Sequence, residues 1–184
     1  MASVLVPLAQ ACEELEAITI IDLLRRAGIE VTTASLDAIT TITASRGCVL
    51  IADTTLELAL EKDYDMLVLP GGLPGADYLN DDPRLHALLK KMAKSEKYIA
   101  AICAAPKVLA RAGLLDRRTA TAYPGTLEKL NLNDTEISGA PVVIDGKIIT
   151  SRGPGTAMDF ALQLIEILVG VDIRKTTEAA LQRA

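Results

Sequence analysis

Apolar residues follow two patterns along the chain. Short continuous runs predict strands, because a strand buried on both faces needs apolar residues at successive positions. Segments with apolar residues every three or four positions predict helices. The runs place strands at 3–8, 30–35, 42–44, 48–52, 64–69, 98–102, 120–122, 142–144 and 147–150. The helical period places helices at 14–26, 56–60, 83–94, 104–112 and 156–169.

The predicted strands and helices alternate, which is typical of a mostly parallel sheet with helices on both faces. The chain has 184 residues, half of them apolar, and no linker-like stretch interrupts it. We therefore expect an α/β sandwich of three layers, formed by a single domain over residues 1–184. Ligands of such folds bind beyond the carboxyl ends of the strands.

Charge and composition narrow the class of partner. The formal net charge is −5, the basic residues are scattered among acids, and the chain has one Phe, four Tyr and no Trp. This composition argues against broad electrostatic binding or base stacking, so we expect no specific nucleic-acid partner. No signal peptide is visible, and no apolar run reaches the ~20 residues that span a bilayer.

Three cysteines, Cys12, Cys48 and Cys103, form an odd set without a C-x-x-C pair. With a single histidine, the chain has no zinc-ligand pattern, and we expect no metal. Free thiols are typical of a cytoplasmic protein, which is the compartment that we expect.

Cys103 lies where a predicted strand meets a predicted helix, in the segment YIAAICAAP at 98–106. Pro106 suits the first turn of a helix, where a missing N–H group costs nothing. A cysteine on such a turn faces free N–H groups and the positive end of the helix dipole. Both favour the thiolate, so we expect a pKa well below about 8.5. An inert buried cysteine is the alternative.

A reactive cysteine needs a group that moves protons. The only histidine, His86, falls inside the helix at 83–94 and is expected at the surface, which argues against a protease or an amidotransferase. Glu16 comes early in the helix after the first strand, although acids there also simply favour the helix N-terminus. A carboxyl beside a thiolate keeps its proton, so we expect Glu16 to donate a hydrogen bond to the sulfur.

Other residues are weaker candidates. Backbone N–H groups at Gly72 and Ala104 are placed to bind an oxyanion. Arg46 lies in a Ser-Arg-Gly turn and has either a structural or an anion-binding role. Cys48 is expected in the core and inert, whereas Cys12 is expected in a loop and partly reactive.

Five segments together resemble the ThiJ/PfpI superfamily, in the branch of the Parkinson-disease protein deglycase and its bacterial relatives. They are EELE at 13–16, DLLRRAG at 22–28, LPGG at 69–72, AAICAAP at 100–106 and TSRGPGT at 150–156. The resemblance covers residues 3–170. It implies a flavodoxin-like fold, a homodimer and no cofactor.

The resemblance also implies roles for single residues. Cys103 matches the reactive cysteine, and Glu16 matches the glutamate bonded to it. Gly72 and Ala104 match the neighbouring amides, and Arg46 matches an arginine near the dimer interface. The implied activities are glyoxalase, deglycase, redox-linked chaperone and, in one branch, peptidase.

Two positions depart from the family pattern. Ala104 stands where the peptidase branch has a histidine, which makes a peptidase the weakest reading. Tyr123-Pro124 stands where the human-like branch has His-Pro, and a tyrosine is a poor base at neutral pH. Tyr123 is therefore expected to orient substrate or fill space.

The leading hypothesis is a cysteine-dependent enzyme that acts on methylglyoxal, glyoxal or their early protein adducts. In it, Cys103 attacks the aldehyde and Glu16 moves a proton. A redox-sensing chaperone that uses the same cysteine is the alternative, and a peptidase or amidotransferase-like hydrolase is a third.

Overall fold

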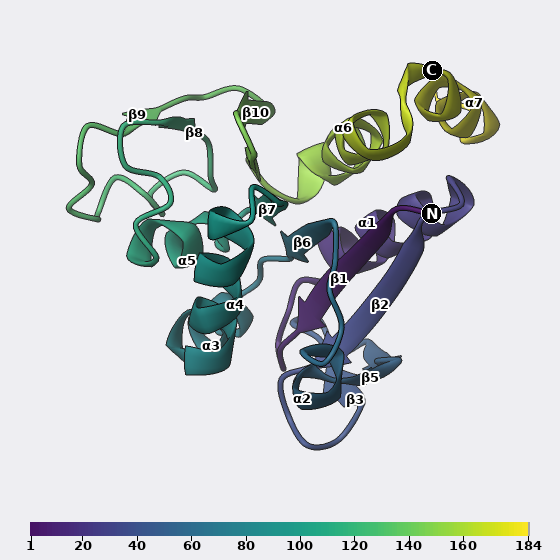
Figure 1. Cartoon of the computed structure of the whole chain (residues 1–184), viewed down its shortest axis with the longest axis horizontal. Coiled ribbons are helices and arrows are strands. Elements are labelled where there is room, and N and C mark those ends of the chain that lie inside the picture. The colour runs from purple at the N-terminus through teal and green to yellow at the C-terminus, as the bar shows by residue number, and fades with distance from the viewer. Residues whose placement is uncertain (184) are drawn as a thin grey trace.

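The computed structural model describes residues 1–183 and places a seven-stranded sheet at the centre of the protein (Figure 1). The strand order is β10-β11-β7-β6-β1-β2-β5. Every neighbouring pair in the sheet is parallel except β10 and β11, which form an antiparallel hairpin. This confirms the α/β architecture with a mostly parallel sheet.

The strands of the central sheet are β1 (Ser3–Leu8), β2 (Glu30–Ser35), β5 (Thr54–Thr55), β6 (Met66–Leu69), β7 (Tyr98–Ile102), β10 (Val142–Asp145) and β11 (Ile148–Ser151). Two small sheets lie outside it, an antiparallel pair of β3 (Thr41–Thr43) and β4 (Val49–Ile51), and a parallel pair of β8 (Thr119–Ala120) and β9 (Glu136–Ile137). The helices are α1 (Glu14–Arg26), α2 (Leu56–Ala59), α3 (Gly75–Asp81), α4 (Pro83–Lys94), α5 (Pro106–Arg111), a 3₁₀ turn η1 (Pro154–Thr156), α6 (Ala157–Val169) and α7 (Val171–Ala180).

Two apolar cores lie on opposite faces of the sheet because successive side chains of a strand point to opposite sides. Val4, Val6 and Leu8 of β1 belong to the core formed with α1 and α6. Leu5 of the same strand belongs to the core formed with α2, α3, α4 and α5. The three layers of the flavodoxin-like sandwich follow from this alternation.

Five elements were not expected from the sequence, among them the 3₁₀ turn η1. The strands β5 and β9 have two residues each, too few for a pattern. Helix α3 has only seven residues and begins at a glycine, and α7 is mostly polar and follows Gly170 directly. The other predicted elements are present with ends that shift by a few residues.

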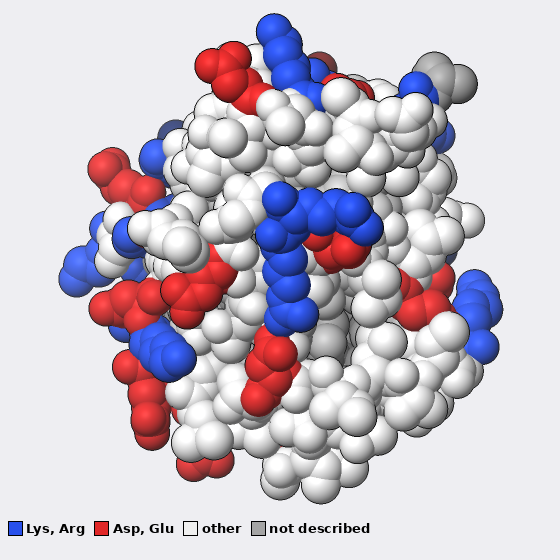
Figure 2. Space-filling model, turned by 90° about the vertical axis from the view of Figure 1, so that its right-hand side faces the viewer, with Lys and Arg blue, Asp and Glu red and all other residues white. Residues whose placement is uncertain are grey.

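Within residues 1–183 no helix is long and apolar enough to cross a membrane. Figure 2 shows acidic and basic side chains interspersed on one face, without a field of a single sign. The single domain over residues 1–184 stays a prediction, and residue 184 lies outside the described part of the chain.

Candidate active site

Cys103 occupies a sharp turn between β7 and α5. Its φ is 64°, in the left-handed region that residues other than glycine rarely adopt. Two backbone hydrogen bonds hold it there. The Cys103 N–H donates to the Ser151 carbonyl at 3.0 Å, and the Tyr123 N–H donates to the Cys103 carbonyl at 2.8 Å. The backbone strain is thus maintained by the last residue of β11 and by the segment that follows β8.

Glu16 approaches Cys103 from the opposite side, in the first turn of α1. Its side chain is fully buried. Oε2 accepts a hydrogen bond from the Gly71 N–H at 2.8 Å, whereas Oε1 has no partner among the described residues. An unpartnered buried oxygen is costly as part of a charged carboxylate, so the surroundings favour a protonated Glu16.

The two glycines after β6 make room for the pair. A Cβ atom on Gly71 would lie 2.7 Å from Cys103 Cβ and 2.7 Å from Glu16 Oε2. Gly72 has a φ of +93°, and a Cβ there would lie 2.4 Å from the Glu13 nitrogen. The backbone of both glycines packs where a side chain would not fit. This close packing brings together the segments that follow β1, β6 and β7.

The carboxyl and the thiol form a coupled pair. Burial raises the pKa of Glu16 to about 7, against hydrogen bonds from Cys103 and Gly71 that lower it. Burial and then the Glu16 charge raise the pKa of Cys103 to about 12, against the N–H groups of Gly72 and Ala104, which donate to the sulfur and lower it.

The low thiol pKa predicted from the helix N-terminus is therefore wrong for a thiol that faces an ionised Glu16. Sequence reasoning counted the N–H donors but missed the depth of burial, since Cys103 is only 9% exposed. Two of the causes that raise the thiol pKa depend on a charged or accepting Glu16. When Glu16 holds the proton, those two causes disappear, and burial alone opposes the N–H donors that lower the thiol pKa.

Arg46 lies on the exposed turn between β3 and β4. Its backbone N–H donates to Glu14 Oε1 at 2.8 Å, and the Ser45 hydroxyl donates to Glu14 Oε2 at 2.9 Å. Burial acts to raise the pKa of Glu14, but these hydrogen bonds outweigh it and lower the pKa. Glu14 thus fastens the β3–β4 hairpin to the start of α1, two residues before Glu16.

Tyr123 lies beside the candidate nucleophile through its backbone, and its side chain is 54% exposed. The ring packs against Gly153, in the segment after β11. His86 belongs to α4, and its Nε2 is 2.8 Å from the Asn80 carbonyl. This contact joins α4 to α3, and it gives His86 a structural partner.

The other two cysteines differ from the sequence-based expectation. Cys12 is fully buried, and burial raises its pKa to about 12, so it is not the partly reactive loop cysteine that was predicted. Cys48 is exposed, not buried in the core, because it lies at the turn of the hairpin, before β4 begins at Val49. A short apolar run does not reveal where the strand begins.

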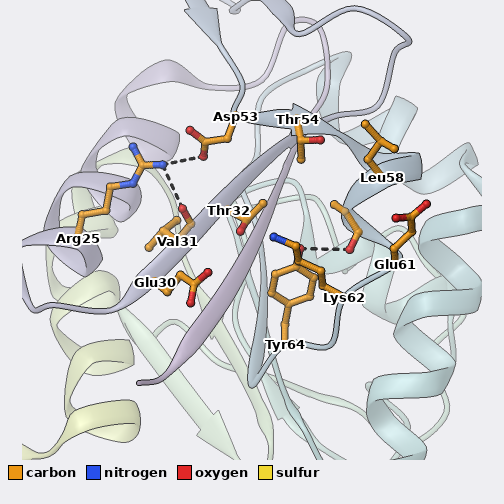
Figure 3. Close-up of a pocket in the computed structure, with 11 residues that line it drawn as sticks. Arg25, Glu30, Val31, Thr32, Asp53, Thr54, Leu58, Glu61, Lys62 and Tyr64 are labelled. Atoms are coloured by element: carbon orange, nitrogen blue, oxygen red, sulfur yellow. Dashed lines mark hydrogen bonds and ion pairs between the residues drawn. The ribbon is translucent and has the colours of Figure 1, made fainter.

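One hollow of the surface lies away from Cys103. It has a volume of about 390 Å³ beside β2 and is lined by Arg25, Asp53, Lys62 and Tyr64 among others (Figure 3). An ion pair between Arg25 and Asp53 at 2.7 Å crosses its upper part. Over residues 1–183 no three His, Cys, Asp or Glu side chains gather as a metal site.

Comparison with known proteins places this geometry in a family. The DJ-1/PfpI family matches residues 2–167. The chain is 42% identical over 169 residues to Protein DJ-1 homolog A of Arabidopsis thaliana, covering 91% of this chain and 43% of that protein. It therefore spans less than half the length of this relative. It is 36% identical over 169 residues to the Caenorhabditis elegans glutathione-independent glyoxalase DJR-1.2, covering 92% and 89% of the two chains.

A solved structure agrees with the sequence comparison. Oxidized DJ-1 of Toxoplasma gondii superposes with a TM-score of 0.95 at 41% identity, covering all of both chains. The family match, the relatives and the shared fold lead to one conclusion: the chain belongs to the DJ-1/PfpI family.

Proposed function

We propose that the protein converts methylglyoxal and glyoxal, free or as early protein adducts, into hydroxy acids through Cys103. One observation supports the proposal above the others. Cys103, which has a strained backbone and a sulfur hydrogen-bonded by two backbone N–H groups, lies against a buried glutamate whose pKa is raised to about 7. A carboxyl with a pKa near the working pH is suited to both give and take a proton.

The pair starts with one proton, which we place on Glu16. The sulfur attacks the aldehyde carbon, and the new alkoxide takes the proton of Glu16 to give a hemithioacetal. The Gly72 and Ala104 N–H groups lie next to the sulfur and stabilise negative charge as it develops.

Glu16, now a carboxylate, removes the proton from the former aldehyde carbon and returns it to the neighbouring carbonyl carbon, while the hydroxyl proton of the first carbon passes to the oxygen of the second. The first carbon is oxidised to a thioester while the second is reduced to an alcohol, so no external oxidant is needed. Water then hydrolyses the thioester, which releases lactate or glycolate and restores Cys103. The chemistry requires no metal or organic cofactor.

The glyoxalase name of the Caenorhabditis elegans relative supports this reaction class. The test is lactate formed from methylglyoxal by the purified protein and by Cys103→Ser, with Cys48→Ser as the matched control. We expect many turnovers per Cys103, no turnover in Cys103→Ser and unchanged turnover in Cys48→Ser. A Cys103→Ser variant as active as the parent would exclude the proposal.

A redox-sensing chaperone is the second candidate. A sulfur between amide donors and an acid can be oxidised to a sulfinate and held there. The oxidized state named for the Toxoplasma gondii relative favours this reading. The same assay separates the candidates, because a sensor reacts once per cysteine and an enzyme turns over.

We also propose that two chains associate as a homodimer and that the protein is cytoplasmic. Four exposed apolar side chains support the dimer: Leu15 and Ile18 on α1, and Val49 and Ile51 on β4. Glu14, in α1, accepts hydrogen bonds from Ser45 and Arg46 in the turn before β4. The apolar residues of α1 and β4 therefore belong to neighbouring segments. Arg46 lies on the same hairpin, where a partner chain would bring it near the cysteine site.

A further inference from the structure

The ring of Tyr123 lies directly on the backbone of Gly153. A Cβ atom on Gly153 would stand 3.3 Å from Tyr123 Cδ2 and 3.9 Å from Cε2. The first distance is shorter than ordinary van der Waals contact between carbon atoms, which begins near ~3.5 Å. A side chain at residue 153 would therefore crowd the ring, which would have to shift by a few tenths of an ångström.

Gly153 cannot retreat from the ring, because Thr156 holds it on both sides. The Gly153 N–H donates to Thr156 Oγ1 at 3.1 Å, and the Thr156 N–H donates to the Gly153 carbonyl at 2.9 Å. The Thr156 hydroxyl is also 2.7 Å from the Ser151 hydroxyl. A side chain at position 153 would therefore displace the half-exposed ring and leave the backbone in place.

Both partners of this contact are fastened to Cys103. The Tyr123 N–H donates to the Cys103 carbonyl, and Gly153 follows two residues after Ser151, whose carbonyl accepts the Cys103 N–H. The ring thus joins the two segments that hold the backbone of the nucleophile. Cys103 is nearly buried, and the half-exposed ring belongs to the residue whose N–H bonds its carbonyl.

We propose that Gly153 is a positioning residue, which seats the Tyr123 ring at the entrance to Cys103 and so restricts the size of the group beside the reacting aldehyde. The proposal deepens the dicarbonyl function and rests on it for the class of substrate. It predicts a preference for a methyl over a phenyl substituent, set by the Gly153 contact acting through Tyr123.

The variants are made in a Cys48→Ser background, so that Cys103 is the accessible thiol. Gly153 has a φ of 167°, an extended conformation that alanine adopts without strain, so Gly153→Ala tests the contact alone. Gly155→Ala is the matched control, because a Cβ there meets nothing within 4 Å. Tyr123→Phe keeps the ring, and Tyr123→Ala removes it.

The first readout is kcat/KM for methylglyoxal relative to phenylglyoxal. We expect Gly153→Ala and Tyr123→Ala each to lower this preference by about tenfold, chiefly through KM for the larger substrate. Gly155→Ala and Tyr123→Phe should keep it. In the Tyr123→Ala background, Gly153→Ala should add nothing, because the contact is already gone.

The second readout needs no enzyme activity. It is the ratio of Cys103 alkylation rates with iodoacetamide and with the bulkier N-phenylmaleimide, which should shift in the same variants. This shift without turnover in any variant would remove the dicarbonyl function and leave the positioning role intact. An unchanged alkylation ratio in Gly153→Ala would overturn the inference. So would a Gly153→Ala substitution that changes the ratio as much in the Tyr123→Ala background as it does when the ring is present.

Discussion

At the scale of single residues, Cys103 and Glu16 depend on each other for their charge. The sulfur has two backbone N–H donors, whereas Glu16 Oε1 has no partner among the described residues. One proton on Glu16 therefore removes the charge from a carboxyl with an unpartnered oxygen and leaves the negative charge where the donors are.

Glu16→Gln separates proton transfer from hydrogen bonding. The amide still donates to the sulfur but cannot exchange a proton between substrate atoms, so turnover of methylglyoxal should fall by about 100-fold or more. Alkylation and oxidation of Cys103 should be largely retained. Glu13→Gln is the control, because that carboxyl bonds the Ser45 hydroxyl, and it should leave turnover unchanged. Full activity in Glu16→Gln would remove Glu16 from the mechanism.

Burial of Glu16 also makes stability depend on pH. Its folded pKa lies above the unfolded value of 4.5, at about 7, so the stabilising contribution is complete below pH 4.5 and is lost as the pH rises through 7. In a Cys103→Ser background, the protein should lose about 3 kcal/mol relative to the same protein with Glu16→Gln. Urea unfolding at several pH values measures this, and parallel pH profiles of the two proteins would contradict it.

At the scale of elements, side chains bond backbone groups of β2 that no neighbouring strand pairs with. The outer edge of β2 pairs with β5 only at Ala34 and Ser35. Further along, Asp53 accepts the Thr33 N–H at 2.8 Å, and Arg25 donates to the Val31 carbonyl at 3.1 Å (Figure 3). The ion pair thereby covers an edge that would otherwise offer free backbone groups.

Asp53→Ala should therefore destabilise the fold by about 1–3 kcal/mol, because it leaves the Thr33 N–H and hydroxyl without their acceptor. Asp63→Ala is the control. Asp63 pairs with Lys91 at the surface and bonds no strand, so its loss should leave the free energy of unfolding nearly unchanged. Equal losses in the two variants, measured by denaturant unfolding, would show that the edge contacts do not matter.

The sequence predicted the long elements because their apolar patterns are long, as in α1, β1 and α4. It also predicted that Cys103 lies on a strand-to-helix turn, because Pro106 marks the helix start. It could not predict that β4 begins only at Val49, after the turn, and so it misplaced Cys48. The contact between the Tyr123 ring and Gly153 joins residues 30 positions apart, and no local sequence pattern predicts a contact of that kind.

At the scale of the whole molecule, the sandwich brings the ends of β1, β6 and β7 to one edge. Glu16, Gly71 and Cys103 each follow one of these strands and meet there. The two cores on either face keep this edge in place, so the site is held by the fold rather than by a mobile loop.

The proposed dimer is tested by molar mass in solution. The protein should have twice the mass of one chain by light scattering, and Ile18→Glu with Ile51→Glu should shift it to a monomer, because both charges would be buried in the interface. Ile144→Glu is the control, since Ile144 is equally exposed on β10, away from α1 and β4. A parent protein of single-chain mass would contradict the homodimer.

The position of the shared proton is tested most directly by the rate of Cys103 alkylation against pH. In the Cys48→Ser protein, Cys12 is buried, so iodoacetamide reports on Cys103. With the proton on Glu16, the thiolate should appear with an apparent pKa well below the ordinary value of about 8.5. An apparent pKa of about 8 or above would mean that the proton stays on sulfur. The proposed nucleophile would then be absent at neutral pH, and the account of the pair would be wrong.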